Sequence, residues 1–141
     1  MPNRSIIVGV DGSATSARAA RTAATLARAL DCTLHVVRAH GHHDAEVVGV
    51  GNDRWVVSED EEITDLMKPL VDELRAIHPS VTVSAPEGRP HDVLIAEAAR
   101  LNAQLIVVGN RHMQGVGRVL GSVANYVAHH APCDVYIAHT T

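Results

Sequence analysis

The chain has 141 residues and a net charge of −4 with its histidines neutral, so it lacks the basic balance of a nucleic-acid-binding protein. Apolar residues make up 46% and phenylalanine is absent, so the core must be aliphatic. No apolar run is long enough for a transmembrane helix or a signal peptide, and we therefore expect a single cytoplasmic domain over 1–141 with neither nucleic acid nor membrane as partner.

Short apolar runs alternate with longer amphipathic segments along the chain. The first run, 6–10, is continuously apolar, as a strand covered on both faces should be. Asp11, Gly12 and Ser13 follow it with the composition of a turn and a helix N-cap. We predict strands over 6–10, 33–37, 81–83, 105–108 and 134–138, and helices over 14–30, 61–77, 90–101 and 122–130.

Three of these helices have a predicted orientation. In 14–30, arginines at 18, 21 and 28 are spaced for one exposed face. Residues 40–60 have no clear period and are predicted to be a long loop. Pro69 falls inside the helix 61–77 and should kink or divide it. The predicted inward residues are Ile63, Leu66, Leu70, Leu74 and Ile77 in that helix, and Val93, Leu94, Ala98 and Leu101 in 90–101.

Strands separated by helices predict βαβ units and a parallel sheet. Ligands bind such sheets beyond the carboxyl ends of the strands, where the strand order reverses. The first and fourth strands lead into Asp11 and Gly109. If these two strands are neighbours, their loops share one crevice, although they are almost a hundred residues apart.

The segment 109–124 has the layout of a phosphate-binding loop. It follows a buried strand, carries several glycines and ends in Gly121-Ser122 at the start of a helix. Glycine lets backbone N–H groups approach an anion closely, the serine hydroxyl donates one more hydrogen bond, and the helix N-terminus adds a favourable dipole. This pattern indicates a nucleotide site.

Several motifs together resemble those of the universal stress proteins, a family of small α/β domains. They are the opening 6–13, Gly88-Arg89-Pro90, Gly121-Ser122-Val123-Ala124 and the closing 130–135, and the resemblance covers nearly the whole chain except 40–60. The resemblance implies a Rossmann-like fold with five parallel strands in the order 3-2-1-4-5 and helices on both faces. It also implies a homodimer that pairs through strand 135–138, an apolar segment that the proposed order leaves at an edge.

Members of this family that bind ATP carry Gly, two residues, Gly, nine residues, and then Gly-Ser or Gly-Thr. Gly109 and Gly121-Ser122 match this pattern. His112 replaces the second glycine, and the spacer 113–120 has eight residues. Gly115 and Gly117 would restore backbone freedom to the shortened loop. A crowding side chain at His112 would favour AMP or cyclic AMP over ATP, whereas an imidazolium there would tighten anion binding below about pH 6.5.

The resemblance implies an adenine-nucleotide site, for ATP, AMP or cyclic AMP, with Mg as a candidate companion ion. Asp11 would lie by the ribose or a divalent cation, and Val36 would meet adenine through its backbone. The phosphates would be held by Gly109, Gly121, Ser122 and Val123, with Arg111 or Arg118 supplying positive charge. The complete predicted site is Val10, Asp11, Val36, Val108, Gly109, Arg111, His112, Gly121, Ser122 and Val123.

Each of these residues has a purely structural alternative. Asp11 can be only the N-cap of the first helix, Gly109 only a tight turn, and Ser122 only the cap of the last helix. His112 can be a solvent-facing loop residue, as can Arg118. A second function therefore stays open, a protein that binds no nucleotide and acts through its dimer surface and the 40–60 segment.

Neither a metal site nor an enzyme is indicated. Adjacent histidines at 42–43 and 129–130 point in different directions, and no zinc-type spacing occurs. Cys32 and Cys133 fit no disulfide framework and are predicted to be small buried residues. Because the sequence has no nucleophile elbow, Walker lysine or paired carboxylates, we expect at most slow ATP hydrolysis, and no catalytic residues are assigned.

Overall fold

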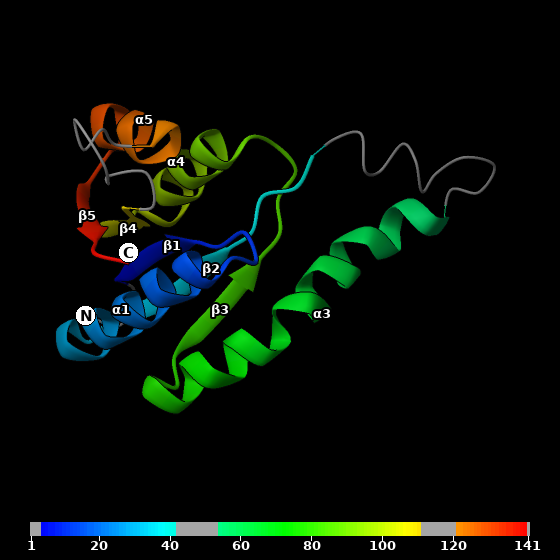
Figure 1. Cartoon of the computed structure of the whole chain (residues 1–141), viewed down its shortest axis with the longest axis horizontal. Helices are drawn as coiled ribbons and strands as arrows, with labels where there is room; N and C mark the ends of the chain where they lie inside the picture. Colours follow the sequence, from blue (N-terminus) through cyan, green and yellow to red (C-terminus); the bar gives the residue numbers. More distant parts are fainter. Residues whose placement is uncertain (1–3, 42–53, 111–120, 141) are drawn as a thin grey trace.

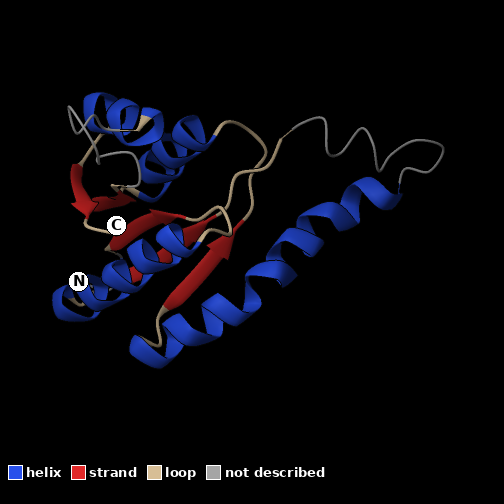
Figure 2. Ribbon diagram, in the orientation of Figure 1, coloured by secondary structure: helices blue, strands red, loops and turns tan. Residues whose placement is uncertain are grey.

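The computed structural model describes residues 4–41, 54–110 and 121–140. Strands and helices alternate along the chain, as Figures 1 and 2 show. The elements are β1 (Ser5–Gly9), α1 (Ala14–Leu30), β2 (Thr33–Val37), α3 (Arg54–Ile77), β3 (Val81–Ser84), α4 (Pro90–Leu101), β4 (Leu105–Gly109), α5 (Ser122–His130) and β5 (Asp134–Ala138).

All five strands pair in parallel in the order β3-β2-β1-β4-β5. The predicted fold class and strand order are therefore confirmed. β1 pairs with β2 on one side and with β4 on the other, with Ile6 opposite Leu105 and Val8 opposite Val107. The chain reverses its direction of travel across the sheet between β1 and β4, so the crevice predicted from the sequence lies at the switch point.

Two aliphatic cores sandwich the sheet. Alternate strand residues face opposite sides, so Ile6 and Val8 pack under α1 and α3, whereas Ile7 packs under α4 and α5. The fully buried alanines of α1 let that helix lie close to the sheet; they are Ala20, Ala23, Ala24 and Ala27. Of the inward residues predicted for α4, Val93, Leu94 and Ala98 are buried and Leu101 is partly buried.

The prediction for the second helix was wrong at its start. α3 begins at Arg54, within the predicted 40–60 loop. A helix that has already nucleated gains one hydrogen bond for each further residue that it fixes, so it extends beyond the segment with a clear apolar period. Residues 54–77 form one helix with Pro69 inside it, so Pro69 does not divide the helix, and a kink there stays a prediction. Pro69 and Asp65, whose carbonyl proline cannot bond, both lie on the exposed side of the helix.

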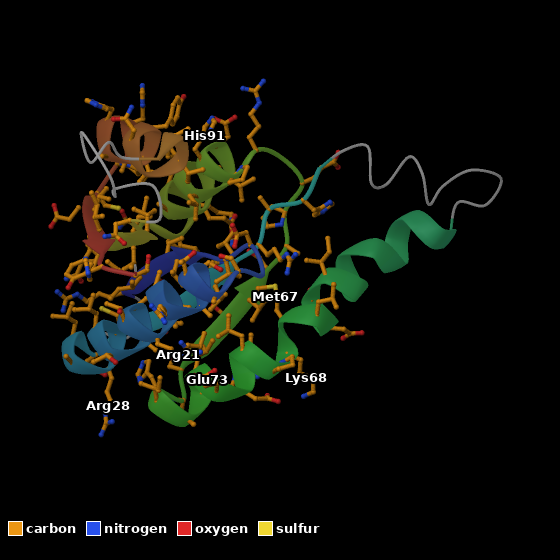
Figure 3. All side chains as sticks on the ribbon, viewed as in Figure 1. Arg21, Arg28, Met67, Lys68, Glu73 and His91 are labelled. Carbon is orange, nitrogen blue, oxygen red and sulfur yellow. The ribbon has the colours of Figure 1, made fainter. Side chains whose placement is uncertain are left out.

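The inward face predicted for α3 is confirmed except at Leu66, since Leu74 is buried and Ile63, Leu70 and Ile77 are partly buried against the core. Leu66 is 69% exposed, whereas Met67, Val71 and Leu74 are buried against the core. Figure 3 shows Met67 on the inner side of α3 and Lys68 on its outer side. Met67 lies one position after Leu66 and takes its place on the inner face, because packing against α1 and the sheet favours the residue that lies on the same side as Ile63 and Leu70.

The exposed face of α1 agrees with the sequence. Arg18, Arg21 and Arg28 are exposed, and Arg21 pairs with Glu73 of α3 across the helix interface (Figure 3). Cys32 is buried as predicted, whereas Cys133 is only partly buried. Within the described ranges no helix combines the length and apolarity needed to cross a membrane.

Candidate ligand-binding cavity

A cavity of about 210 Å³ opens at the switch point between β1 and β4. Its floor is made by the carboxyl ends of these strands, and the N-termini of three helices reach its rim. The lining residues are Gly9, Val10, Asp11, Ser13, Thr15, Ser16, Val37, Ala39, Pro90, Leu94, Val108, Gly109, Gly121, Ser122, Val123 and Ala124. Seven of the ten residues predicted for the site are among them.

Asp11 leads from β1 into α1 through a tight turn. Its Oδ1 accepts a hydrogen bond of 2.9 Å from the N–H of Ser13, and Gly12 between them has a φ of 87°. This left-handed conformation favours glycine over any residue with a Cβ. Ser13, rather than Asp11, is the N-cap of α1, because its Oγ accepts from the N–H of Ser16. The alternative that Asp11 is only that helix's cap is therefore wrong.

A group of hydroxyls surrounds the start of α1 on the cavity wall. The Oγ of Ser13 lies 3.1 Å from Oγ1 of Thr15. Ser16 donates its hydroxyl to the carbonyl of Ser13 and accepts from the N–H of Asp11. These bonds hold the turn after β1 in shape, and they place hydroxyl groups on the same side of the cavity as the Asp11 carboxylate.

The opposite wall is the N-terminus of α5. Gly121 is the N-cap, and the first backbone hydrogen bond of the helix runs from the N–H of Asn125 to its carbonyl. The N–H groups of Ser122, Val123 and Ala124 precede that bond, so the helix itself does not satisfy them. Ser122 is the first helical residue and not the cap, contrary to the structural alternative for it. A helix terminus of this kind attracts anions.

Two glycines on the cavity floor lie where a Cβ would be crowded by neighbouring side chains. A Cβ at Gly109 would lie 3.2 Å from Oγ1 of Thr140, and a Cβ at Gly9 would lie 3.0 Å from the side chain of Leu94. Gly109 is the last residue of β4 and not part of a left-handed turn. Thr140 is itself fixed by Asn110, whose Oδ1 accepts from the N–H and hydroxyl of Thr140 at 2.7 and 3.0 Å.

The cavity combines apolar walls with a polar rim. Val10, Val37, Leu94 and Val108 give it an aliphatic surface that suits a flat, weakly polar ring system. Among the described residues that line it, Asp11 alone has an ionisable side chain. Within this described lining, the groups suited to an anion are the backbone N–H groups and the dipole at the N-terminus of α5.

Of the three other predicted site residues, the structure describes one, Val36, and it does not line the cavity. Val36 is fully buried in the middle of the sheet, where it pairs with Val8 and Val83, and the neighbouring Val37 contributes to the lining instead. Arg111 and His112, together with Arg118, Gly115 and Gly117, lie outside the described residues.

The sequence predictions missed half of the wall. The hydroxyl side chains of Ser13, Thr15 and Ser16 were not assigned to the site, and neither were the apolar residues Pro90 and Leu94. A signal existed for both, because the hydroxyls follow the Asp11 turn directly and Pro90 belongs to the Gly88-Arg89-Pro90 motif. Within 4–41, 54–110 and 121–140, no group of three or more His, Cys, Asp or Glu side chains is placed to hold a metal ion.

Comparison with known proteins gives one consistent result. The model of the universal stress protein family matches residues 2–139. A universal stress protein of Mycobacterium tuberculosis (strain ATCC 25618 / H37Rv) is 34% identical over 146 positions, covering 98% of this chain and 97% of the relative. A solved universal stress protein in complex with cAMP has a TM-score of 0.76 at 28% identity, covering 98% of both chains. The one from Archaeoglobus fulgidus in complex with dAMP has a TM-score of 0.71 at 25% identity, covering 97% of this chain and 98% of that one.

Proposed function

The chain belongs to the universal stress protein family, and on that premise we propose that it binds an adenine nucleotide in the cavity between β1, β4 and α5. The observation that carries the proposal is the position of the α5 N-terminus at the rim of an aliphatic cavity at the switch point. Two solved relatives support it, because their complexes contain cAMP and dAMP.

Each part of a nucleotide has a matching part of the cavity. The adenine ring would lie between the aliphatic side chains of Val10, Val37 and Leu94. The ribose hydroxyls would donate to the Asp11 carboxylate. The phosphate would accept from the backbone N–H groups that follow Gly121 and from the Ser122 hydroxyl. Asp11 is also the described lining residue that could contact Mg bound to an ATP phosphate.

Isothermal titration calorimetry with ATP, AMP and cyclic AMP tests this proposal, each with and without magnesium. We expect heat of binding and saturation with at least one of them. A nucleotide of a different base, such as CTP, is the matched control, since its smaller ring would fill the aliphatic cavity less well. If no adenine nucleotide produces heat under either condition, the nucleotide proposal is wrong.

A second proposal concerns the assembly of the protein. It is also the basis of the alternative function, in which the protein binds no nucleotide. We propose that the chain forms a homodimer through the edge strand β5. Tyr136 and Ile137 on this strand are 43% and 38% exposed, and an exposed apolar edge strand readily pairs with another chain. A protein without nucleotide would act through this dimer surface and its partners.

Sedimentation at micromolar concentration tests the dimer. We expect a dimer for the wild type and a shift to monomer for Ile137→Lys, whose charge would be buried in the pair. Leu66→Lys introduces the same charge at an exposed apolar residue of α3, away from β5, and is the control. A monomeric wild type would contradict the proposal. The cytoplasmic location expected from the composition is part of the same proposed function, and cell fractionation would test it.

A further inference from the structure

A second polar cluster lies at the other end of the sheet, at the corner made by β2 and β3. The core under α4 and α5 contains described residues of β1, β2, β4 and β5 but none of β3. In Figure 1 these two helices lie toward the β4–β5 end of the sheet, with β3 at the opposite end beside α3. On this uncovered side Thr82 of β3 is exposed, and it is in register with the buried His35 of β2.

His35 connects an exposed hydroxyl to a carboxylate. Its Nδ1 lies 2.6 Å from Oγ1 of Thr82, and its Nε2 lies 3.0 Å from Oε1 of Glu97 on α4. Ser84 adds a hydroxyl that donates to the same Glu97 oxygen at 3.1 Å. Arg100 holds Glu97 in place from one turn further along α4, with two hydrogen bonds of 2.9 and 2.8 Å.

The proton positions in this cluster follow from its charges. The hydrogen bonds from Arg100, together with those from His35 and Ser84, lower the pKa of Glu97 to about 2, so it is a carboxylate at neutral pH and can only accept. The Nε2 of His35 must therefore carry the proton that faces Glu97. Burial lowers the pKa of His35, so the ring is neutral at pH 7 and its Nδ1 presents a lone pair to the Thr82 hydroxyl.

We propose that Thr82 is an activated nucleophile that accepts acyl groups from activated acyl donors, with His35 as its general base and Glu97 as the residue that orients the base. An exposed hydroxyl, a neutral imidazole within 2.6 Å and a buried carboxylate on the far ring nitrogen reproduce the roles of nucleophile, base and orienting group. The cluster uses none of the residues that line the nucleotide cavity.

The reaction with an ester balances within these groups. Oγ1 of Thr82 attacks the carbonyl carbon, and its proton moves to Nδ1 of His35 while Glu97 stabilises the imidazolium. The bond from the carbonyl carbon to the leaving oxygen then breaks, and the electron pair leaves with that oxygen. The products are an acyl ester of Thr82 and the free alcohol or phenol, with the proton passed from His35 to solvent or to the leaving group.

The test uses p-nitrophenyl acetate as the probe and reads the acetylated residue by peptide mass spectrometry. Thr33 is a partly buried control inside the same protein, because it lies two residues before His35 on the same face and its hydroxyl pairs with Oγ of Ser80 at 2.9 Å. We expect acetylation of Thr82 at least about a hundredfold faster than that of Thr33, which is the smaller end of the range for general base catalysis.

Two variants identify the labelled hydroxyl, and a pH profile separates its activation from simple exposure. Thr82→Val should remove the label, whereas Thr82→Ser should keep it; both change an exposed residue, so the fold should be retained. The charged groups that act on His35 are Glu97 and Arg100 of α4. The polar groups that face it from β3 are the uncharged hydroxyls of Thr82 and Ser84. The rate should therefore be level near pH 7 and fall only when His35 is protonated, below about pH 6.5. Equal labelling of Thr33 and Thr82, or a rate that rises tenfold per pH unit as hydroxide does, would overturn the proposal.

Discussion

The cavity at β1 and β4 and the cluster at β2 and β3 are both polar regions at one sheet, but they satisfy their polar groups in different ways. The cavity is lined by small residues, and the first N–H groups of α5 face it without helical partners. In the cluster, His35, Glu97 and Ser84 form hydrogen bonds with one another. The charged side chains of Glu97 and Arg100, both on α4, also bond to each other. The first region is shaped for a ligand that brings its own acceptors, whereas the second is complete and exposes a single reactive hydroxyl.

Because of this difference, we expect substitutions in the cavity and in the cluster to affect different properties of the protein. Changes at the cavity rim, at Gly121 and Ser122, should alter ligand affinity and leave the free energy of unfolding nearly unchanged, because these two residues are not buried. Changes in the cluster should alter stability and leave nucleotide affinity unchanged. The following predictions test that separation, from the largest expected effect to the smallest.

The largest effect is expected for Gly121→Phe. Gly121 has a φ of −63°, which any residue adopts, so the backbone accepts the change while the ring fills the cavity. We expect nucleotide affinity to fall by about a hundredfold or more, since a blocked N-terminus loses several hydrogen bonds of about 1 kcal/mol each. Calorimetry measures the affinity, and Ala128→Phe on the exposed side of α5 is the control. Unchanged affinity in Gly121→Phe would show that the nucleotide binds elsewhere.

The next effect is expected for Glu97→Ala. The Glu97 side chain is 11% exposed, so its removal leaves the buried His35 and Ser84 without their acceptor. An unsatisfied buried polar group costs about 1–3 kcal/mol, and we expect a loss of about 2–3 kcal/mol in the free energy of unfolding. Urea unfolding measures it.

Glu73→Ala is the control for that variant. Glu73 pairs with Arg21, but both side chains are nearly half exposed, at 46% and 43%. Surface ion pairs contribute about 0–1 kcal/mol, so this change should cost less than 1 kcal/mol. Equal costs at Glu97 and Glu73 would contradict the view that burial makes the β2–β3 cluster important for stability.

The same cluster should make the protein sensitive to acid. Folding lowers the pKa of His35 below 6.5 and that of Glu97 from 4.5 to about 2, so the unfolded chain binds more protons at low pH. Stability is then fully present above about pH 6.5, and it falls as pH drops, most steeply between about 4.5 and 2. Urea unfolding at a series of pH values should show this loss in the wild type and a shallower one in Glu97→Gln. Parallel curves for the two proteins would assign the acid sensitivity to other carboxylates.

The smallest effect is expected for Ser122→Ala. The hydroxyl of this exposed residue at the start of α5 would supply one hydrogen bond to the phosphate, next to backbone N–H groups that the variant retains. We expect a loss of about 1 kcal/mol in nucleotide binding, or about fivefold in affinity, with no change in stability. A loss as large as that of Gly121→Phe would mean that the side chain rather than the backbone holds the phosphate.

The sequence by itself determined the alternation of strands and helices, and the resemblance to the family supplied the strand order 3-2-1-4-5. Continuous apolar runs such as 6–10 are buried on both faces, and that pattern is local. The sequence also indicated two opposite walls of the cavity. Asp11 lies in a turn and Gly121 at the start of a helix, and both features can be recognised from neighbouring residues alone.

Only the tertiary structure decided which residues meet across the sheet. The face of α3 was set by packing, which buries Met67 and exposes Leu66, and no leucine spacing reports that choice. Val37 rather than Val36 lines the cavity, because side chains alternate along β2 and only one face turns toward α4. The contact between Thr82, His35 and Glu97 joins residues up to 62 positions apart, and it forms because parallel pairing places Thr82 beside His35 and Glu97 of α4 reaches the same imidazole.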